Sequence, residues 1–201
     1  MKFSELGLSA PLCVAARRAG YVEPTAIQAQ AVTPALHGRD VIGIARTGTG
    51  KTAAFLLPLA EQLLSTRTAR RGRRVRQVRA LVLCPTRELA LQVAADAVTL
   101  TRGCDLRVLC VHGKVSLGPQ ADAIAAGVDL LVATPGRVQE LLDAEALDLS
   151  LVRHVVLDEA DRMLDMGFEP QVRAILAHVP GDRQMLLFTA TFGGSVEALA
   201  S

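Results

Sequence analysis

VIGIARTGTGKT, residues 41–52, joins a short apolar run to a glycine loop and a Lys-Thr pair. The residues that follow, as far as Leu64, continue in a helical pattern. A strand, a glycine loop, a Lys-Thr pair and a helix in this order are typical of a phosphate-binding loop. Gly48 and Gly50 permit backbone angles at which successive N–H groups point at phosphate oxygens, and the helix start adds the positive end of its dipole. A glycine-rich turn with an incidental Lys-Thr pair is the less specific alternative.

The polar residues of this loop have expected roles. Lys51 would reach the β- and γ-phosphates of a nucleotide, and the Thr52 hydroxyl would bind Mg²⁺. Ala45 stands where the strict pattern has its first glycine. The loop residues expected to bind nucleotide are Ala45, Arg46, Thr47, Gly48, Thr49, Gly50, Lys51 and Thr52.

Short apolar runs recur along the chain and predict a sheet. They are rich in Val, Leu and Ile without polar alternation, so both faces of each strand are expected to be covered, as in a parallel sheet between helices. Helical stretches such as 87–100 separate them. The prediction is an α/β fold with a mostly parallel sheet flanked by helices on both faces. The expected strands are 41–45, 80–84, 107–111, 129–133, 154–158 and 185–189.

The length and net charge of the chain limit the number of domains and the kinds of partner to expect. The chain has 201 residues, half of them hydrophobic, which is enough for one well-buried domain and short for two. We therefore expect a single domain over residues 1–201. The formal net charge of +2 neither requires nor excludes a nucleic-acid partner, so any basic surface must be local.

The cysteines and the N-terminal sequence indicate where in the cell the protein is expected. No CxxC pair occurs, and Cys84 and Cys110 lie in apolar runs, so we expect reduced thiols and no zinc site. The N-terminal MKFSELGLSA lacks the apolar segment of a signal peptide, and no run is long enough to span a bilayer. We expect a cytoplasmic protein with no membrane partner.

An acidic cluster ends the run VVLDEADRMLDMGF, residues 155–168. Because ligands of open α/β sheets bind at the carboxyl ends of the strands, Asp158 is expected close to the phosphate-binding loop and could hold the same Mg²⁺ as Thr52. Glu159 could orient or deprotonate a water for attack on the γ-phosphate. The expected catalytic residues are thus Glu159, Asp158 and Lys51. A solvated helix start, where acidic residues are common, is the alternative.

The letters DEAD at 158–161 complete a wider pattern. With them the chain resembles the first RecA-like domain of the DEAD-box ATP-dependent RNA helicases, with a core of the bacterial type. An aromatic residue followed by GYVEPTAIQ, residues 20–28, matches the adenine-recognition motif of that family, which we place in the region 1–28. The resemblance implies that Gln28 pairs with the adenine edge, that Tyr21 stacks on its ring and that Phe3 braces the motif. It assigns adenine recognition, and ATP as the cofactor, to Phe3, Tyr21, Thr25 and Gln28.

Two further motifs match RNA-binding motifs of this family, PTRELA at 85–90 and TPGR at 134–137. Thr86 and Thr134 suit helix N-caps, which would leave N–H groups to face phosphates. Simple helix capping is the alternative. The family usually has paired glycines near 113, whereas here Lys114 takes the second position, which would be strained if the backbone there has positive φ. The residues expected to bind RNA are Pro85, Thr86, Arg87, Gly113, Thr134, Pro135, Gly136 and Arg137.

The resemblance also implies coupling between ATP and RNA. TAT at 189–191 corresponds to the family's S-A-T motif, and the retained hydroxyl of Thr189 could keep its bond to the acidic motif. Asp161, Thr189 and Thr191 are the expected coupling residues. The arginine-rich segment 66–79 is expected to be a solvated loop, with an auxiliary RNA contact as the alternative.

The resemblance covers only the first of the two RecA-like domains of the family. The missing domain would supply the arginine finger and half of the RNA groove. We expect an ATP-binding domain of a helicase that unwinds or remodels RNA through backbone contacts, with weak ATP binding and little turnover by this chain alone. The alternatives are another P-loop enzyme, such as a DNA translocase or small nucleotide kinase, and a non-catalytic RNA- or nucleotide-binding module.

Overall fold

The computed structural model describes residues 1–68, 77–191 and 193–200. Six parallel strands form one sheet in the order β1-β6-β5-β2-β4-β3. The strands are β1 Val41–Ile44, β2 Ala80–Leu83, β3 Val108–Val111, β4 Leu130–Ala133, β5 His154–Leu157 and β6 Gln184–Thr189. All six predicted strands are confirmed, each within two residues of its expected bounds.

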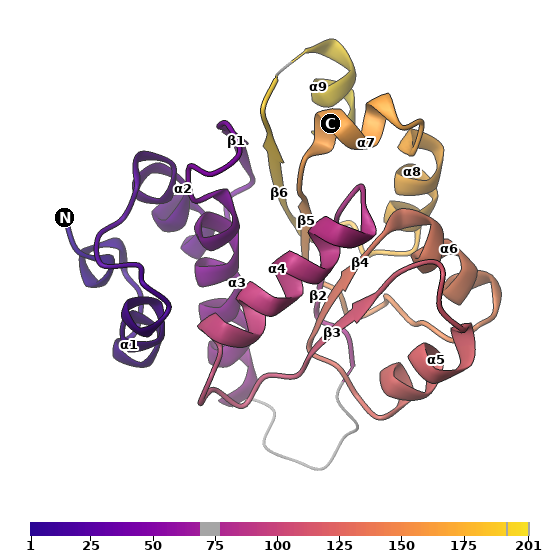
Figure 1. The fold of residues 1–201 in the computed structure, drawn as a ribbon, viewed down its shortest axis with the longest axis horizontal. Coiled ribbons are helices and arrows are strands. Elements are labelled where there is room, and N and C mark those ends of the chain that lie inside the picture. The colour runs from indigo at the N-terminus through magenta and orange to yellow at the C-terminus, as the bar shows by residue number, and fades with distance from the viewer. Residues whose placement is uncertain (69–76, 192, 201) are drawn as a thin grey trace.

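Helices cover both faces of the sheet, as the apolar runs predicted (Figure 1). One face carries η1 Phe3–Leu6, α1 Ala10–Arg18, α2 Ala26–Leu36, α3 Lys51–Thr68 and α4 Arg87–Leu100. The other carries α5 Leu117–Ala125, α6 Pro135–Asp143, α7 Ala160–Asp165, α8 Glu169–Ala177 and α9 Gly194–Ala200. The predicted α/β fold is therefore confirmed.

Side-chain alternation along each strand separates two hydrophobic cores. In β2, Ala80 and Val82 pack with the helices α2 to α4, whereas Leu81 and Leu83 pack with α6 to α8. All four residues of β2 are buried, because its neighbours β5 and β4 and both helical layers cover it. A strand buried on both faces explains the absence of polar alternation in its sequence.

The parallel arrangement brings the loops that follow the strands to one edge of the sheet. The predicted site motifs after position 41 start in such a loop, in the first turn of the helix after it or, for the motif at 189–191, at the last residue of β6. The arginine-rich segment 66–79 lies mostly outside the described residues. Along the described part of the chain, no helix is both long and apolar enough to cross a membrane.

Candidate functional site

The phosphate-binding loop occupies the turn from β1 to α3. Gly48 and Gly50 have φ of +84° and +93°, the left-handed conformation that glycine adopts at least cost. The Thr49 hydroxyl donates to the Arg46 carbonyl at 2.7 Å, which closes the turn. The Ala45 N–H donates to the Thr189 carbonyl at 3.0 Å, so the start of the loop is hydrogen-bonded to the end of β6.

Lys51 begins α3, and its ammonium is near enough to Asp158 to act on the pKa of that carboxyl. The residue is 7% exposed, and its Nζ has no hydrogen-bond partner among the described residues. A buried ammonium without a partner is unfavourable, and phosphate oxygens would supply the missing acceptors. This feature fits a nucleotide phosphate.

Asp158 follows β5 at the same edge of the sheet. It is 3% exposed, and burial raises the pKa of its carboxyl to about 6, although the nearby Lys51 ammonium opposes that rise. A divalent cation would offset the cost of this buried carboxylate. The described residues contain no cluster of three or more His, Cys, Asp or Glu that could hold a metal. An Mg²⁺ ion at Asp158 and Thr52 would therefore complete its shell with phosphate oxygens and water, as Mg²⁺ usually does.

Glu159 occupies a strained turn between β5 and α7. Its backbone has φ 51° and ψ 53°, a left-handed conformation that costs roughly 1–2 kcal/mol for a residue with a Cβ. Its Oε2 lies 3.2 Å from Arg162 Nη1, one helical turn further on. Strained residues held by their surroundings cluster at functional sites. The Arg162 contact was not predicted from the sequence, although the i,i+3 spacing on a helix could have indicated it.

Asp161 connects the acidic turn to the segment after β6. Its Oδ2 accepts hydrogen bonds from the N–H groups of Ala190 and Thr191 and from the Thr191 hydroxyl, at 3.1, 2.9 and 3.0 Å. Burial raises the pKa of Asp161, but the hydrogen bonds from Thr191 outweigh that effect and the net pKa is lowered. Asp161 and Thr191, both expected to couple the ATP site to RNA binding, are thus in contact. The Thr189 hydroxyl donates at 2.6 Å to the Thr191 carbonyl, and a side-chain hydrogen bond from Thr189 also contributes to lowering the pKa of Asp161, in line with the expected bond to the acidic motif.

The adenine motif lies beside the phosphate-binding loop, but Gln28 already has partners there. Its Oε1 accepts from the Thr25 N–H at 3.0 Å, which completes a capping box at the start of α2. Its Nε2 donates to the Gly50 carbonyl at 3.0 Å. Gln28 is fully buried, so an adenine ring would have to displace these partners.

The two aromatic residues of this motif differ in burial. Phe3 is 5% exposed and packs in the core beneath η1, which suits a bracing residue. Tyr21 is partly buried, and burial, with a contribution from Asp96 on α4, raises the pKa of its phenol. A partly open ring at this position is accessible for stacking.

The predicted RNA-binding motifs follow β2, β3 and β4, which lie side by side in the sheet. Thr86 caps α4 by accepting from the Leu89 N–H at 3.2 Å, as expected. Thr134 holds the N-cap position of α6 with Pro135 in the first turn, but its hydroxyl makes no capping bond. Pro85 is buried, while Gly113 and Gly136 are partly exposed.

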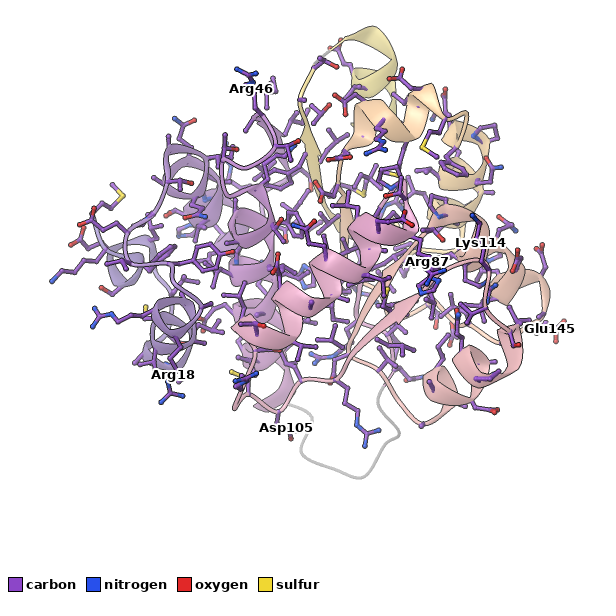
Figure 2. The ribbon with its side chains drawn as sticks, viewed as in Figure 1. Arg18, Arg46, Arg87, Asp105, Lys114 and Glu145 are labelled. Carbon is purple, nitrogen blue, oxygen red and sulfur yellow. The ribbon has the colours of Figure 1, made fainter. Side chains whose placement is uncertain are left out.

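The two arginines of these motifs differ in exposure. Arg87 is exposed and lies close to the viewer in Figure 2. Arg137 is only 5% exposed, so its guanidinium does not reach the surface as we had expected. Lys114 is exposed and has φ +65°, which confirms that the backbone there requires the conformation usual for glycine.

Comparison with known proteins identifies the class of molecule. The DEAD/DEAH box helicase family matches residues 25–199, and the chain belongs to this family. The pre-mRNA-processing ATP-dependent RNA helicase prp5 of Neosartorya fischeri is 44% identical over 203 residues, covering 100% of this chain and 17% of that protein. The probable ATP-dependent RNA helicase DDX46 of Homo sapiens is 43% identical, covering 98% and 19%.

A solved structure agrees with the fold as well as with the family. The crystal structure of a DEAD box protein from the hyperthermophile Methanococcus jannaschii matches with a TM-score of 0.91 at 36% identity, covering 100% of this chain and 53% of that chain. The chain thus spans less than a fifth of the two helicases and about half of the solved protein. These relatives are eukaryotic and archaeal, and they give no support to the bacterial-type core that we had expected.

Proposed function

We propose that the chain is the ATP-binding RecA-like domain of an RNA helicase, in which ATP hydrolysis drives the unwinding or remodelling of RNA. The observation that carries this proposal is the position of β6 between β1 and β5. The end of β6 accepts a hydrogen bond from Ala45 at the start of the phosphate-binding loop, and the residues after it donate to Asp161 in the acidic turn. A displacement of either loop would therefore act on the other through these hydrogen bonds.

The proposed roles follow from charge and position. Lys51 would neutralise the β- and γ-phosphates, while Thr52 and Asp158 would hold Mg²⁺, which supplies charge stabilisation to the transferring phosphoryl group. Glu159 would orient the attacking water and accept its proton. Gln28 would exchange its Thr25 and Gly50 partners for the adenine edge, supported by Tyr21 and Phe3.

A second RecA-like domain belongs to this proposal, because the helicase relatives are much longer than this chain. That domain would supply the cationic side chain that stabilises the transition state, an effect of roughly 10³ to 10⁵ in rate in related phosphoryl-transfer enzymes. We therefore expect the 201-residue chain, taken as one domain, to bind ATP with little turnover. A cytoplasmic location stays a prediction.

The test is a titration of the chain with a fluorescent ATP analogue in the presence of Mg²⁺, with phosphate release measured in parallel. Lys51→Ala should weaken binding roughly 10- to 100-fold, the range expected for loss of a charged hydrogen-bonding group. Glu159→Gln should bind as the wild type does. Lys2→Ala, an exposed lysine away from the loop, is the matched control.

Two results would contradict the proposal. Equal binding by Lys51→Ala and the wild type would remove the phosphate role of the loop. Rapid RNA-stimulated turnover by the chain alone would remove the need for a second domain. Equal affinity for ATP and GTP would instead favour the alternative of a different P-loop enzyme.

A further inference from the structure

A large cavity lies at the edge of the sheet opposite the phosphate-binding loop. Its volume is about 890 Å³, within the range of roughly 300–1,000 Å³ that is usual for ligand pockets. Its lining residues precede strands, since Gln77 and Val78 lead into β2 and Ser150 lies shortly before β5. The cavity is therefore separate from the motifs expected to bind nucleotide and RNA in the loops that follow the strands.

The floor of this cavity is apolar. Val78, Leu147 and Leu149 are buried there, and Leu142 and Ala146 are half-buried beside them. An arginine or lysine side chain can lay its methylene groups along such a surface while its charged end stays at the rim. The floor therefore suits a ligand with an aliphatic stem.

Two carboxylates stand at the rim of the cavity. Glu145 and Asp148 are both exposed, and Glu145 lies at the outer side of the domain (Figure 2). Asp148 Oδ1 accepts from the Ser150 N–H at 2.8 Å, and the hydrogen bonds from the backbone and side chain of Ser150 lower the pKa of Asp148. Neither carboxylate has an ion-pair partner among the described residues. A cation that pairs with them has to come from elsewhere.

Three helices end at the cavity. Ile124 and Ala125 belong to the last turn of α5, Leu142 belongs to the last turn of α6, and His178 is the C-cap of α8. None of these last turns contains a basic residue. Because the carboxyl end of a helix carries a partial negative charge, the three ends add to the field of the two carboxylates. The cavity is therefore favourable for a cation and unfavourable for an anion.

Arginines of the chain already bind two of these helix ends. Arg107 Nη1 donates to the Ala126 carbonyl after α5 at 2.6 Å. Arg183 Nη1 donates to the Leu176 and Val179 carbonyls at the end of α8, at 3.3 and 3.1 Å. Within the described ranges, no arginine or lysine donates to the last carbonyls of α6. The end of α6 is thus the place where a further guanidinium fits.

We propose that this cavity binds an arginine side chain of a separate polypeptide, with the guanidinium between Glu145 and Asp148 and the methylene groups on the apolar floor. The planar fork of guanidinium donors suits two acceptors better than a compact ammonium does. The chain's own arginine-rich segment 66–79, in which Gln77 and Val78 line the cavity, is the other source of arginine that the experiment has to distinguish. The inference does not depend on the proposed function.

The experiment is an NMR titration of the isotopically labelled chain with N-acetyl-arginine methylamide, a probe for an arginine within a polypeptide. The amide signals of residues 145–150 should shift, and N-acetyl-citrulline methylamide, which has nearly the same shape without the charge, should cause no shift. N-acetyl-lysine methylamide should bind more weakly than the arginine probe. Glu145→Gln and Asp148→Asn should each weaken binding about 3-fold, and the double variant about 10-fold, as expected for exposed ion pairs.

Asp165→Asn is the matched control. Asp165 is an exposed carboxylate at the end of α7, which follows β5 and so lies at the opposite edge of the sheet. This variant should bind the arginine probe as the wild type does. Thermal unfolding followed by circular dichroism checks that weaker binding by the other variants is not caused by partial unfolding.

The outcomes separate the site from its source of arginine. Equal binding of the arginine and citrulline probes, or equal binding by the double variant and the wild type, would overturn the site. A further variant has every arginine of 66–79 replaced by glutamine. If this variant binds the probe and the wild type does not, the chain's own arginines occupy the cavity and the separate polypeptide is overturned.

Nucleotide binding is the readout that separates this inference from the proposed function. The affinity for the fluorescent ATP analogue should be the same with and without the arginine probe, because the cavity lies at the opposite edge of the sheet. Competition between the two, with shifts at the acidic turn 158–161, would place the probe at the nucleotide site and overturn the inference. Failure of the ATP analogue to bind would overturn the proposed function and leave the arginine site standing.

Discussion

Asp161→Ala tests the connection between the acidic turn and the segment after β6. The substitution removes the carboxylate oxygen that accepts three hydrogen bonds, two from backbone N–H groups and one from the Thr191 hydroxyl. A hydrogen bond contributes about 0.5–1.5 kcal/mol net, and bonds to a charged group more. Since Ala190 and Thr191 are exposed, water can replace part of this, and we expect a loss of about 2–3 kcal/mol in the free energy of unfolding.

The assay is urea denaturation followed by circular dichroism, with thermal melts as a second measurement. A loss of about 2–3 kcal/mol corresponds to a fall in Tm of about 5–10 °C for a domain of this size. Thr191→Ala removes only the hydroxyl bond and should cost about 1 kcal/mol. In the Asp161→Ala background, Thr191→Ala should cost almost nothing, because its partner is already absent.

Asp165→Ala is the control, because Asp165 is an exposed carboxylate at the end of the same helix, α7. If Asp161→Ala and Asp165→Ala have the same stability, the hydrogen bonds to the segment after β6 do not hold the site together. Additive effects of the Asp161 and Thr191 substitutions would refute the coupling equally.

Three other regions give predictions. Glu145 has φ 52° at the residue after the C-cap of α6, so Glu145→Gly should stabilise the domain by up to about 1 kcal/mol, and a loss in urea denaturation would contradict this. Burial lowers the pKa of His154, so near this pKa the folded chain binds fewer protons than the unfolded chain. The free energy of unfolding should therefore fall as the pH drops below about 6.5. His154→Gln should reduce this pH dependence between about pH 7.5 and about pH 5.5, and an unchanged dependence of stability on pH would contradict the prediction. β1 is at one edge of the sheet, and its Ile42 and Ile44 are 42% and 55% exposed. Ile42→Lys should therefore reduce concentration-dependent self-association, measured by light scattering. Equal association of the variant and the wild type would exclude this edge as the site of self-association.

The structural features predicted correctly from the sequence are those that depend on local residue patterns. The six apolar runs are strands because residues buried on both faces must be apolar throughout, a constraint that is visible without the structure. The glycine loop before Lys51 was predicted correctly because positive φ limits the residue types there. The same reasoning applied to Lys114, where the loss of a glycine indicated strain and the structure has φ +65°.

The choice of partner by long side chains could not be predicted in this way. Arg137 was expected to offer its charge to RNA phosphates, but its side chain is buried, with Nη2 donating to the Val115 carbonyl and Nε beside the carboxylate of the exposed Glu140. Gln28 was expected to be available to adenine, yet the Gly50 carbonyl already accepts from it. The Val115 and Gly50 partners depend on how distant loops approach each other, about which periodicity carries no information, whereas the i,i+3 spacing on α6 could have indicated the Glu140 contact.

The position of β6 also constrains the order in which the chain can fold. β1 pairs only with β6 within the described residues, although the two strands are separated by the whole sequence from Ile44 to Gln184. The phosphate-binding loop is complete in sequence at Thr52, but its supporting strand has no neighbour in the sheet until residues 184–189 have been synthesised. Pairings between such distant segments form slowly. A ribosome-bound chain that stops before residue 184 should therefore expose β1 on both edges and lack a formed phosphate-binding loop, however complete the rest of the sheet is.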